Sequence, residues 1–177
     1  MAFAYPINSE EAIKAQMADL QKRYHDARHH CFAWRLGANL DRYRVNDDGE
    51  PSGSAGKPIF GQIQSRNLTD VLVVVIRYFG GTLLGVGGLI NAYRSAASDA
   101  LDQAQIMEMK VYSQLKLEFG YAQMNSVMKV IKDFHLKFEK QQFDLECSLT
   151  LKIWKREEIQ VADKLSNIVG CKVEIIP

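Results

Sequence analysis

The sequence lacks the long hydrophobic runs, the signal sequence and the cysteine pattern of a membrane or secreted protein. Its longest uninterrupted aliphatic run covers residues 71–76, whereas a membrane-spanning helix needs about 20 apolar residues. Residues 1–6 carry no basic region followed by a long apolar stretch, which argues against a signal peptide. Cys31, Cys147 and Cys171 are scattered and form no CxxC pair, so neither a disulfide scaffold nor a zinc ribbon is indicated. We therefore expect a reduced, cytoplasmic protein without membrane contact, metal or cofactor.

The chain also lacks an excess of charge of one sign. Its 22 Lys and Arg residues stand against 21 Asp and Glu residues, which gives a net charge of +1. Residues 1–107 hold 11 basic and 11 acidic side chains, and residues 108–177 hold 11 and 10. Neither part has the basic excess of a non-specific nucleic-acid-binding protein, so any such contact must come from a local patch. With 47% apolar residues, the composition fits one large or two small globular domains.

The hydrophobic pattern of residues 108–177 predicts a small α+β domain. Alternating apolar residues indicate strands, and apolar residues three or four apart indicate helices. The fourth expected element includes Phe143 and Leu145, and the stripe of the second helix includes Ile159 and Val169. The β-α-β-β-α-β order is that of the ferredoxin-like unit. The expected elements are a strand at 111–119, a helix at 124–134, a short strand from 136, a strand at 143–153, a helix at 159–169 and a strand at 171–175.

The outward-facing positions of this predicted sheet argue against an RNA-recognition surface. Sheets that bind RNA present aromatic rings on which bases stack. Here one aromatic residue accompanies four lysines and five acidic residues, so we expect the face to repel phosphate weakly. A solvated or protein-contacting face without chemistry is favoured. The outward positions are Tyr112, Gln114, Lys116, Glu118, Lys137, Glu139, Asp144, Glu146, Ser148, Thr150, Lys152, Lys172 and Glu174.

Residues 1–107 predict a second, N-terminal α/β domain. Asn8 followed by Glu11 resembles a capping box, which predicts a helix start just before an apolar stripe. The run at 71–76 is apolar on both faces, which is typical of a central strand. The expected elements are a helix with its stripe at 13–24, strands at 30–36 and 43–46, a central strand at 71–76 and a long helix at 89–104.

Nine of the twelve glycines fall between Gly49 and Gly88, and eight of these lie in a first loop at 47–58 and a second loop at 77–88. The second loop contains no lysine, so it is not a P-loop, and Ile90 stands where a dinucleotide fingerprint needs glycine. The second loop nevertheless leads from a strand into the start of a helix. Such a helix start presents free backbone N–H groups and the positive end of the helix dipole. This order favours an anion or RNA site, unless the glycines only permit tight packing and a sharp turn. The site would use Gly80, Gly81, Gly85, Gly87 and Gly88, with positive charge from Lys57, Arg77 and Arg94.

The first loop carries three acidic residues and weak nucleophile candidates. Its carboxylates suit either a hard-cation site or a partner for the nearby arginines, but turn chemistry is favoured. Ser54 lacks the glycine that a nucleophile elbow needs where Ser52 stands. His29 and Cys31 share a strand face, yet a thiol packed beside a histidine is favoured over a catalytic pair. The acidic residues are Asp47, Asp48 and Glu50, beside Gly49, Pro51, Gly53 and Gly56.

The second loop also holds an aromatic pair. Tyr78 and Phe79, with Leu84, either form an exposed anchor for a protein partner or complete the core. The degree of exposure decides between these two interpretations.

Three stretches resemble the signature of the YigZ/Impact family, and the resemblance covers residues 3–107. It implies a fold similar to the second domain of the fifth small-subunit ribosomal protein, which recurs in translation factors and galactokinase-type kinases. Residues 108–177 are similar to a C-terminal domain of elongation factor G. The stretches are Asp47-Asp48-Gly49-Glu50-Pro51-Ser52-Gly53-Ser54-Ala55-Gly56-Lys57-Pro58-Ile59, then Arg77-Tyr78-Phe79-Gly80-Gly81-Thr82-Leu83-Leu84-Gly85-Val86-Gly87-Gly88-Leu89 through Ala92-Tyr93, and His29, Cys31 and Ala33.

One departure from the family pattern lies at the start of the chain. Family members usually carry a further N-terminal segment with a Lys-x-Ser-x-Phe stretch, whereas this chain starts at Met1-Ala2-Phe3. We expect either a trimmed first strand or a start that lies further upstream, and the role of that segment stays open.

The resemblance implies a role linked to translation, because the eukaryotic relatives regulate translation during amino-acid starvation. We therefore expect a non-catalytic regulator that binds RNA or the ribosome through the two loops. One alternative is an enzyme that acts on a phosphorylated or anionic small molecule at the same loops. Another is a protein–protein adaptor that uses the aromatic pair, and the oligomeric state stays open.

Overall fold

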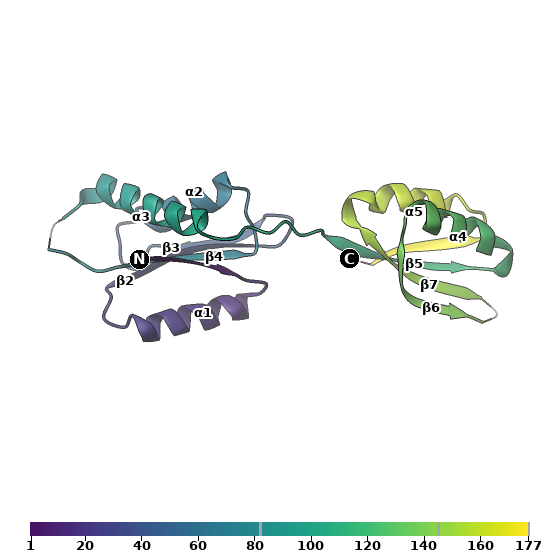
Figure 1. Ribbon diagram of the computed structural model, residues 1–177, viewed down its shortest axis with the longest axis horizontal. Coiled ribbons are helices and arrows are strands. Elements are labelled where there is room, and N and C mark those ends of the chain that lie inside the picture. The colour runs from purple at the N-terminus through teal and green to yellow at the C-terminus, as the bar shows by residue number, and fades with distance from the viewer. Residues whose placement is uncertain (82, 145, 177) are drawn as a thin grey trace. The chain divides into compact units, whose positions relative to one another are not determined.

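The computed structural model describes residues 1–81, 83–144 and 146–176, and the chain divides into two compact units, Met1–Ile106 and Met107–Pro177. Thr82 of the second loop and Leu145 lie outside the described residues. Each unit combines helices with one four-stranded antiparallel sheet, so the chain belongs to the α+β class (Figure 1).

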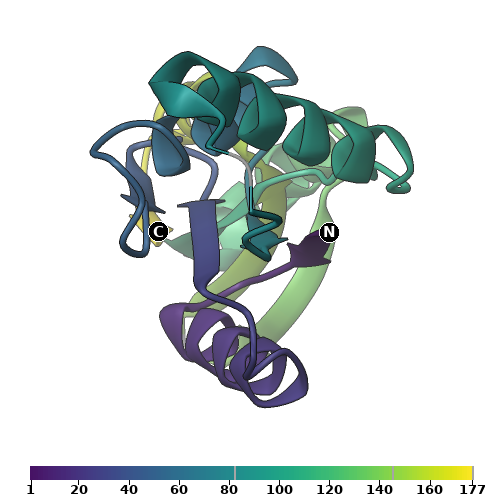
Figure 2. The same ribbon diagram turned by 90° about the vertical axis from the view of Figure 1, so that its left-hand side faces the viewer.

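The first unit is built on a sheet in the order β1-β4-β2-β3. As the run of apolar residues predicted, β4 lies inside the sheet and is buried on both faces. Helix α1 covers one face, and α2 and α3 cover the other (Figure 2). The elements are β1 (Ala2–Pro6), α1 (Glu10–Arg23), β2 (His29–Leu36), β3 (Arg42–Asn46), α2 (Gly56–Ser65), β4 (Val71–Arg77) and α3 (Gly85–Asp102).

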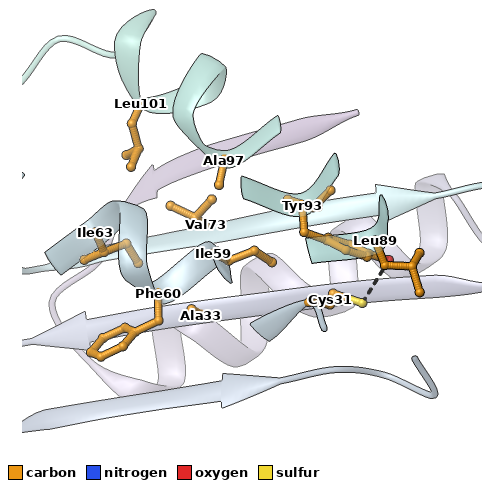
Figure 3. Close-up of a cluster of buried hydrophobic side chains, with 12 residues drawn as sticks. Cys31, Ala33, Ile59, Phe60, Ile63, Val73, Leu89, Tyr93, Ala97 and Leu101 are labelled. Atoms are coloured by element: carbon orange, nitrogen blue, oxygen red, sulfur yellow. Dashed lines mark hydrogen bonds between the residues drawn. The ribbon is translucent and has the colours of Figure 1, made fainter. Parts of the chain in front are cut away.

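Two hydrophobic cores lie on the two faces of this sheet, and the side chains of β2 alternate between them. Trp34 and Leu36 pack in the core that includes Ile13 and Leu20 of α1. Cys31 and Ala33 point the other way, toward a core formed with Ile59 and Ile63 of α2 and with Leu89, Tyr93, Ala97 and Leu101 of α3 (Figure 3). The sheet therefore places the Cys31 side chain beneath the start of α3.

Two helix starts differ from the sequence prediction, and one helix was not predicted. Ser9, not Asn8, caps α1, because its side-chain oxygen accepts the N–H of Ala12. Helix α2 was not predicted, since its apolar residues follow a glycine-rich loop that contains Pro58. Helix α3 begins at Gly85, so the last glycines of the second loop form its first turn.

The second unit has the predicted β-α-β-β-α-β order and the strand order β6-β7-β5-β8. Leu115, Leu117, Leu149 and Leu151 of the central strands are fully buried under the helices. The elements are β5 (Tyr112–Phe119), α4 (Met124–Asp133), β6 (Lys137–Phe143), β7 (Cys147–Trp154), α5 (Glu158–Ser166) and β8 (Cys171–Ile176), with 3₁₀ turns η1 (Tyr121–Gln123) and η2 (Lys155–Glu157).

Two details of this unit were predicted wrongly. Phe143 belongs to β6 rather than to the following strand. Ile159 and Val169 are 73% and 90% exposed, whereas Val161 and Leu165 form the buried stripe of α5. Ala162 and Leu165, the middle members of the predicted stripe, do pack in the core, so only its two outer members were assigned wrongly.

In the described part of the chain, the helices are too short or too polar to cross a membrane.

Candidate functional site

The first loop is held in place by Asp47. Its carboxylate accepts the backbone N–H groups of Gly53, Ala55 and Gly56 at 2.8, 3.0 and 2.8 Å. These bonds satisfy N–H groups at the start of α2 that have no partner within the helix. Burial acts to raise the pKa of the Asp47 carboxyl, but the three N–H groups together hold it below its usual range. Asp47 therefore acts as a charged cap that fixes the loop on α2.

Asp48 joins the same loop to the start of β2. Its carboxylate accepts the backbone N–H of His30 at 2.6 Å, and its carbonyl oxygen lies 2.7 Å from Nδ1 of His29. Since a carbonyl oxygen can only accept, Nδ1 of His29 carries the proton and Nε2 faces away from Asp48. The predicted turn chemistry of the acidic residues is thus present, as local hydrogen bonds to the neighbouring strand.

Glu50 is the centre of a half-buried polar cluster, which we call the Glu50 cluster: Glu50, Arg77, Tyr93, His29 and Cys31. The Glu50 side chain is 5% exposed, and its Oε1 accepts from Arg77 at 2.8 Å and from the Tyr93 hydroxyl at 2.7 Å. Nε2 of His29 lies 3.9 Å from the same oxygen. Four elements far apart in sequence are thereby joined by one carboxylate, which is the arginine partnership expected for this loop.

The Cys31 thiol is the last member of the cluster, and its surroundings do not favour the reactive thiolate form. It donates to the Asp47 carbonyl at 3.0 Å and lies 3.3 Å from the Tyr93 hydroxyl (Figure 3). Burial raises the pKa of Cys31 to about 12, and burial also raises the pKa of Tyr93 above its usual range. Because the thiolate is the reactive form, both groups stay protonated and unreactive at neutral pH.

The acidic residues of the first loop are engaged by the protein itself. Asp47, Asp48 and Glu50 each hold backbone or side-chain donors, as described above. Within the described residues, no three His, Cys, Asp or Glu side chains form a group suited to a metal ion.

The first loop also needs its glycines for packing. A Cβ on Gly56 would lie 2.8 Å from the backbone nitrogen of Asn46, closer than real side chains come. The loop therefore folds directly against the end of β3, and a side chain at this position would push the two apart.

The second loop is open to solvent. Tyr78, Phe79, Leu83 and Leu84 are 44%, 41%, 85% and 49% exposed, so they do not complete the core. Among the described residues, a Cβ placed on Gly80, Gly81, Gly85 or Gly87 would have no atom within 4 Å beyond its chain neighbours and the backbone of its own helix. Packing does not require these four glycines, in contrast to Gly56, although Gly81 and Gly85 have φ angles of +87° and +68°, a backbone conformation that favours glycine.

Two arginines accompany the exposed aromatic residues. The guanidinium carbons of Arg28 and Arg77 lie 5.8 and 5.9 Å from the ring centre of Phe79. The Tyr78 hydroxyl donates to Asp26 at 2.8 Å. Sequence reasoning missed Arg28, although strand pairing explains its place: β2 and β4 are antiparallel with His29 opposite Arg77, so the residue before His29 meets the residues after Arg77.

The start of α3 receives no hydrogen bond from the side chain of its own cap residue. Leu84 occupies the cap position without a side-chain hydrogen bond, and the first turn contains no acidic residue. Of the other predicted basic residues, Lys57 lies in α2 with its side chain against Gly53, and Arg94 lies on the exposed side of α3 near Asn91. Around the second loop, positive charge thus comes from Arg28, Arg77 and the dipole of α3.

The comparisons with known proteins agree with this architecture. A crystal structure described as that of a hypothetical protein superposes with a TM-score of 0.66 at 28% identity, covering 99% of this chain and 86% of that one. A relative from Escherichia coli, "IMPACT family member YigZ", is 39% identical over 66% of this chain and 58% of its own length. An "IMPACT family member" from Haemophilus influenzae is 36% identical over 81% of this chain and 70% of its own.

The family extends to eukaryotes. A "Protein IMPACT homolog" from Saccharomyces cerevisiae is 37% identical over 48% of this chain and 34% of its own length. Residues 1–101 match the Impact N-terminal domain, which includes both loops and the whole Glu50 cluster. The chain belongs to the YigZ/Impact family.

Proposed function

We propose that the chain is a non-catalytic, translation-linked protein that binds RNA or the ribosome through the second loop. The observation that carries this proposal is the contrast between the two glycine loops. In the first loop, backbone N–H groups bond to Asp47 and Gly56 packs against β3. In the second loop, four glycines have no neighbouring atom within 4 Å among the described residues. Glycines without a packing role leave the backbone accessible to a ligand.

The chemistry of the second loop suits an anionic and aromatic ligand. The uncapped start of α3 offers backbone N–H groups and the positive end of a helix dipole to a phosphate. Phe79 is exposed for stacking, and Arg28 and Arg77 flank it. Aromatic rings beside arginines are the usual means of holding unpaired RNA bases.

The charge available to this site is small. Glu50 neutralises much of Arg77, and the whole chain has a net charge of +1. If about three phosphates are contacted, the logarithm of the binding constant falls with that of the salt concentration with a slope of about −2. We therefore expect weak binding with a shallow dependence on salt.

Ribosome co-sedimentation at low and physiological salt tests the proposal. Phe79→Ala and Arg28→Ala should each weaken binding, with about fivefold or more lost on removal of the ring. Arg44→Ala on β3 is the matched control, since Arg44 is also exposed but lies outside the second loop. Absence of binding at both salt concentrations, or equal binding by all four proteins, would refute the proposal.

A protein partner is the second candidate, because the exposed side chains of Leu83 and Leu84 also suit an apolar contact. Binding to this kind of partner would depend on Phe79 but hardly on salt. An enzymatic role on an anionic small molecule predicts a rise in thermal stability with a nucleotide and metabolite panel.

A further inference from the structure

We infer that the second unit carries a separate binding site for single-stranded nucleic acid on the open face of its sheet. The site lies where β5 begins and β7 ends. We call it the aromatic corner, and it consists of Lys110, Tyr112, Lys152, Trp154 and Arg156. It shares no residue with the second loop, and it does not depend on the function proposed for that loop.

Strand register places two aromatic rings side by side. Tyr112 and Trp154 are directly paired across β5 and β7, which lie next to each other in the sheet (Figure 1). Directly paired residues project to the same face. Leu151 and Ile153 are buried on the helix side, so Trp154 lies with Lys152 on the open side. The sequence prediction counted one aromatic residue on this face, because it did not extend the strand to Trp154.

Three cations already lie over these rings. Nζ of Lys110 and the guanidinium carbon of Arg156 lie 4.2 and 3.2 Å from a ring centre of Trp154. Nζ of Lys152 lies 4.5 Å from the ring centre of Tyr112, which is 48% exposed. The Arg156 side chain is 66% exposed, and its only close acidic neighbour among the described residues is Glu157, at 3.8 Å. A planar guanidinium on tryptophan extends the stacking surface outward, since bases also stack on arginine.

Two lysines meet on the open face at the aromatic corner, and the nearest carboxylate there, that of Glu139, accepts from Gln114, which is opposite Lys152. At the aromatic corner, Lys137 of β6 is directly opposite Lys152 of β7. Like charges in this position repel each other, and an anion between them relieves the repulsion. At the far end, Glu118 and Glu174 are offset by Lys116 and Lys172.

Single-stranded nucleic acid is the partner that uses all of these features. The exposed ring of Tyr112 and the partly exposed ring of Trp154 provide stacking, and the lysines provide contacts to a flexible phosphate backbone. A duplex would hide its bases from Tyr112 and Trp154. An acidic peptide would use the lysines but not the pair of rings.

Tryptophan fluorescence of the full chain tests this inference. The chain has two tryptophans, and Trp34 is buried in the first unit at 8% exposed, so Trp154 is the accessible reporter. Titration with a short oligouridylate should quench the fluorescence, and Trp154→Phe should abolish the quenching. An oligothymidylate titrated in parallel tells whether the ribose hydroxyl contributes. If neither oligonucleotide quenches the fluorescence, the inference is overturned.

Affinities from labelled oligouridylate identify the contributing residues. Tyr112→Ala should weaken binding about fivefold or more. Lys152→Ala should reduce the salt slope by about 0.7. Lys164→Ala is the matched control, because Lys164 also lies over a ring, that of Phe134 at 4.8 Å, but on a helix. An effect of Lys164→Ala equal to that of Lys152→Ala would overturn the site.

Two further experiments test whether the second loop causes the quenching and whether stacking contributes to binding. Phe79→Ala and Arg28→Ala should leave the Trp154 quenching unchanged even if ribosome binding is lost or never present. Loss of the quenching in these variants would assign it to the second loop instead. Inorganic polyphosphate or an acidic peptide that binds as tightly as oligouridylate would overturn the role of stacking.

Discussion

The two glycine loops of the first unit use the same residue type for opposite purposes. In the first loop, Gly56 allows the backbone to approach Asn46, and Asp47 ties the loop to α2. In the second loop, four of the five glycines have no neighbouring atom within 4 Å among the described residues, and aromatic side chains are exposed. The comparison teaches that a glycine-rich signature does not by itself indicate a ligand site. The contacts around each glycine decide whether the protein or a partner needs it.

The largest expected effect comes from breaking the Glu50 cluster, which anchors the first loop to β4. Arg77→Ala leaves the Glu50 carboxylate almost fully buried without its ion pair. We expect the free energy of unfolding of the first unit to fall by about 3–5 kcal/mol. Urea denaturation followed by Trp34 fluorescence, in a Trp154→Phe background, measures this unit alone.

The control is an exposed ion pair in the same unit. Arg42 contacts Glu10 at 3.0 Å, but both side chains are more than half exposed. Arg42→Ala should therefore cost less than about 1 kcal/mol. Equal losses for Arg77→Ala and Arg42→Ala would contradict the central role of Glu50. Because Arg77→Ala is expected to destabilise the first unit, this variant is a poor test of ligand binding.

An intermediate effect is expected from the same substitution in each loop. Gly56→Ala brings a methyl group to 2.8 Å from the Asn46 nitrogen, so we expect a loss of about 1–3 kcal/mol. Gly80→Ala meets no atom within 4 Å and should change stability by less than about 0.5 kcal/mol. Thermal or urea denaturation of both variants measures the difference. Similar values for the two variants would remove the distinction between the loops.

The smallest effect concerns the charge of Asp47. Its pKa is lowered in the folded state, so its contribution to stability is present above the pKa of the unfolded chain, near 4, and is lost as the pH falls through the folded-state pKa. Asp47→Asn should cost about 1 kcal/mol at neutral pH and little at acidic pH. Denaturation midpoints from neutral to acidic pH measure this change. A constant difference between variant and wild type across that range would contradict the assignment.

Local patterns predicted most elements because each strand or helix buries one side. The alternation in β5 and in the later part of β7 correctly identified a sheet covered on one face, and the run in β4 identified a central strand. Helix α2 escaped prediction because its first turn is glycine-rich and its cap, Asp47, lies eight residues before Ala55. A cap supplied from so far away leaves no local signature.

The proposed binding surfaces were predicted less completely than the fold. Arg28 and Trp154 were missed because each gains its role from a neighbour on an adjacent strand. The arginine partnership of Glu50 was foreseen as one alternative, but not the joining of Tyr93 and His29 to the same oxygen.

The sequence by itself determined the family, the α+β class and the positions of most strands and helices. It could do so because burial of alternating or helically spaced apolar residues is a local property of the chain. Only the tertiary structure decided which loop is internal, which arginine is paired and where two rings meet on the second sheet. Those properties depend on strand register and on carboxylates that bind donors from several elements, and a linear pattern does not contain that information.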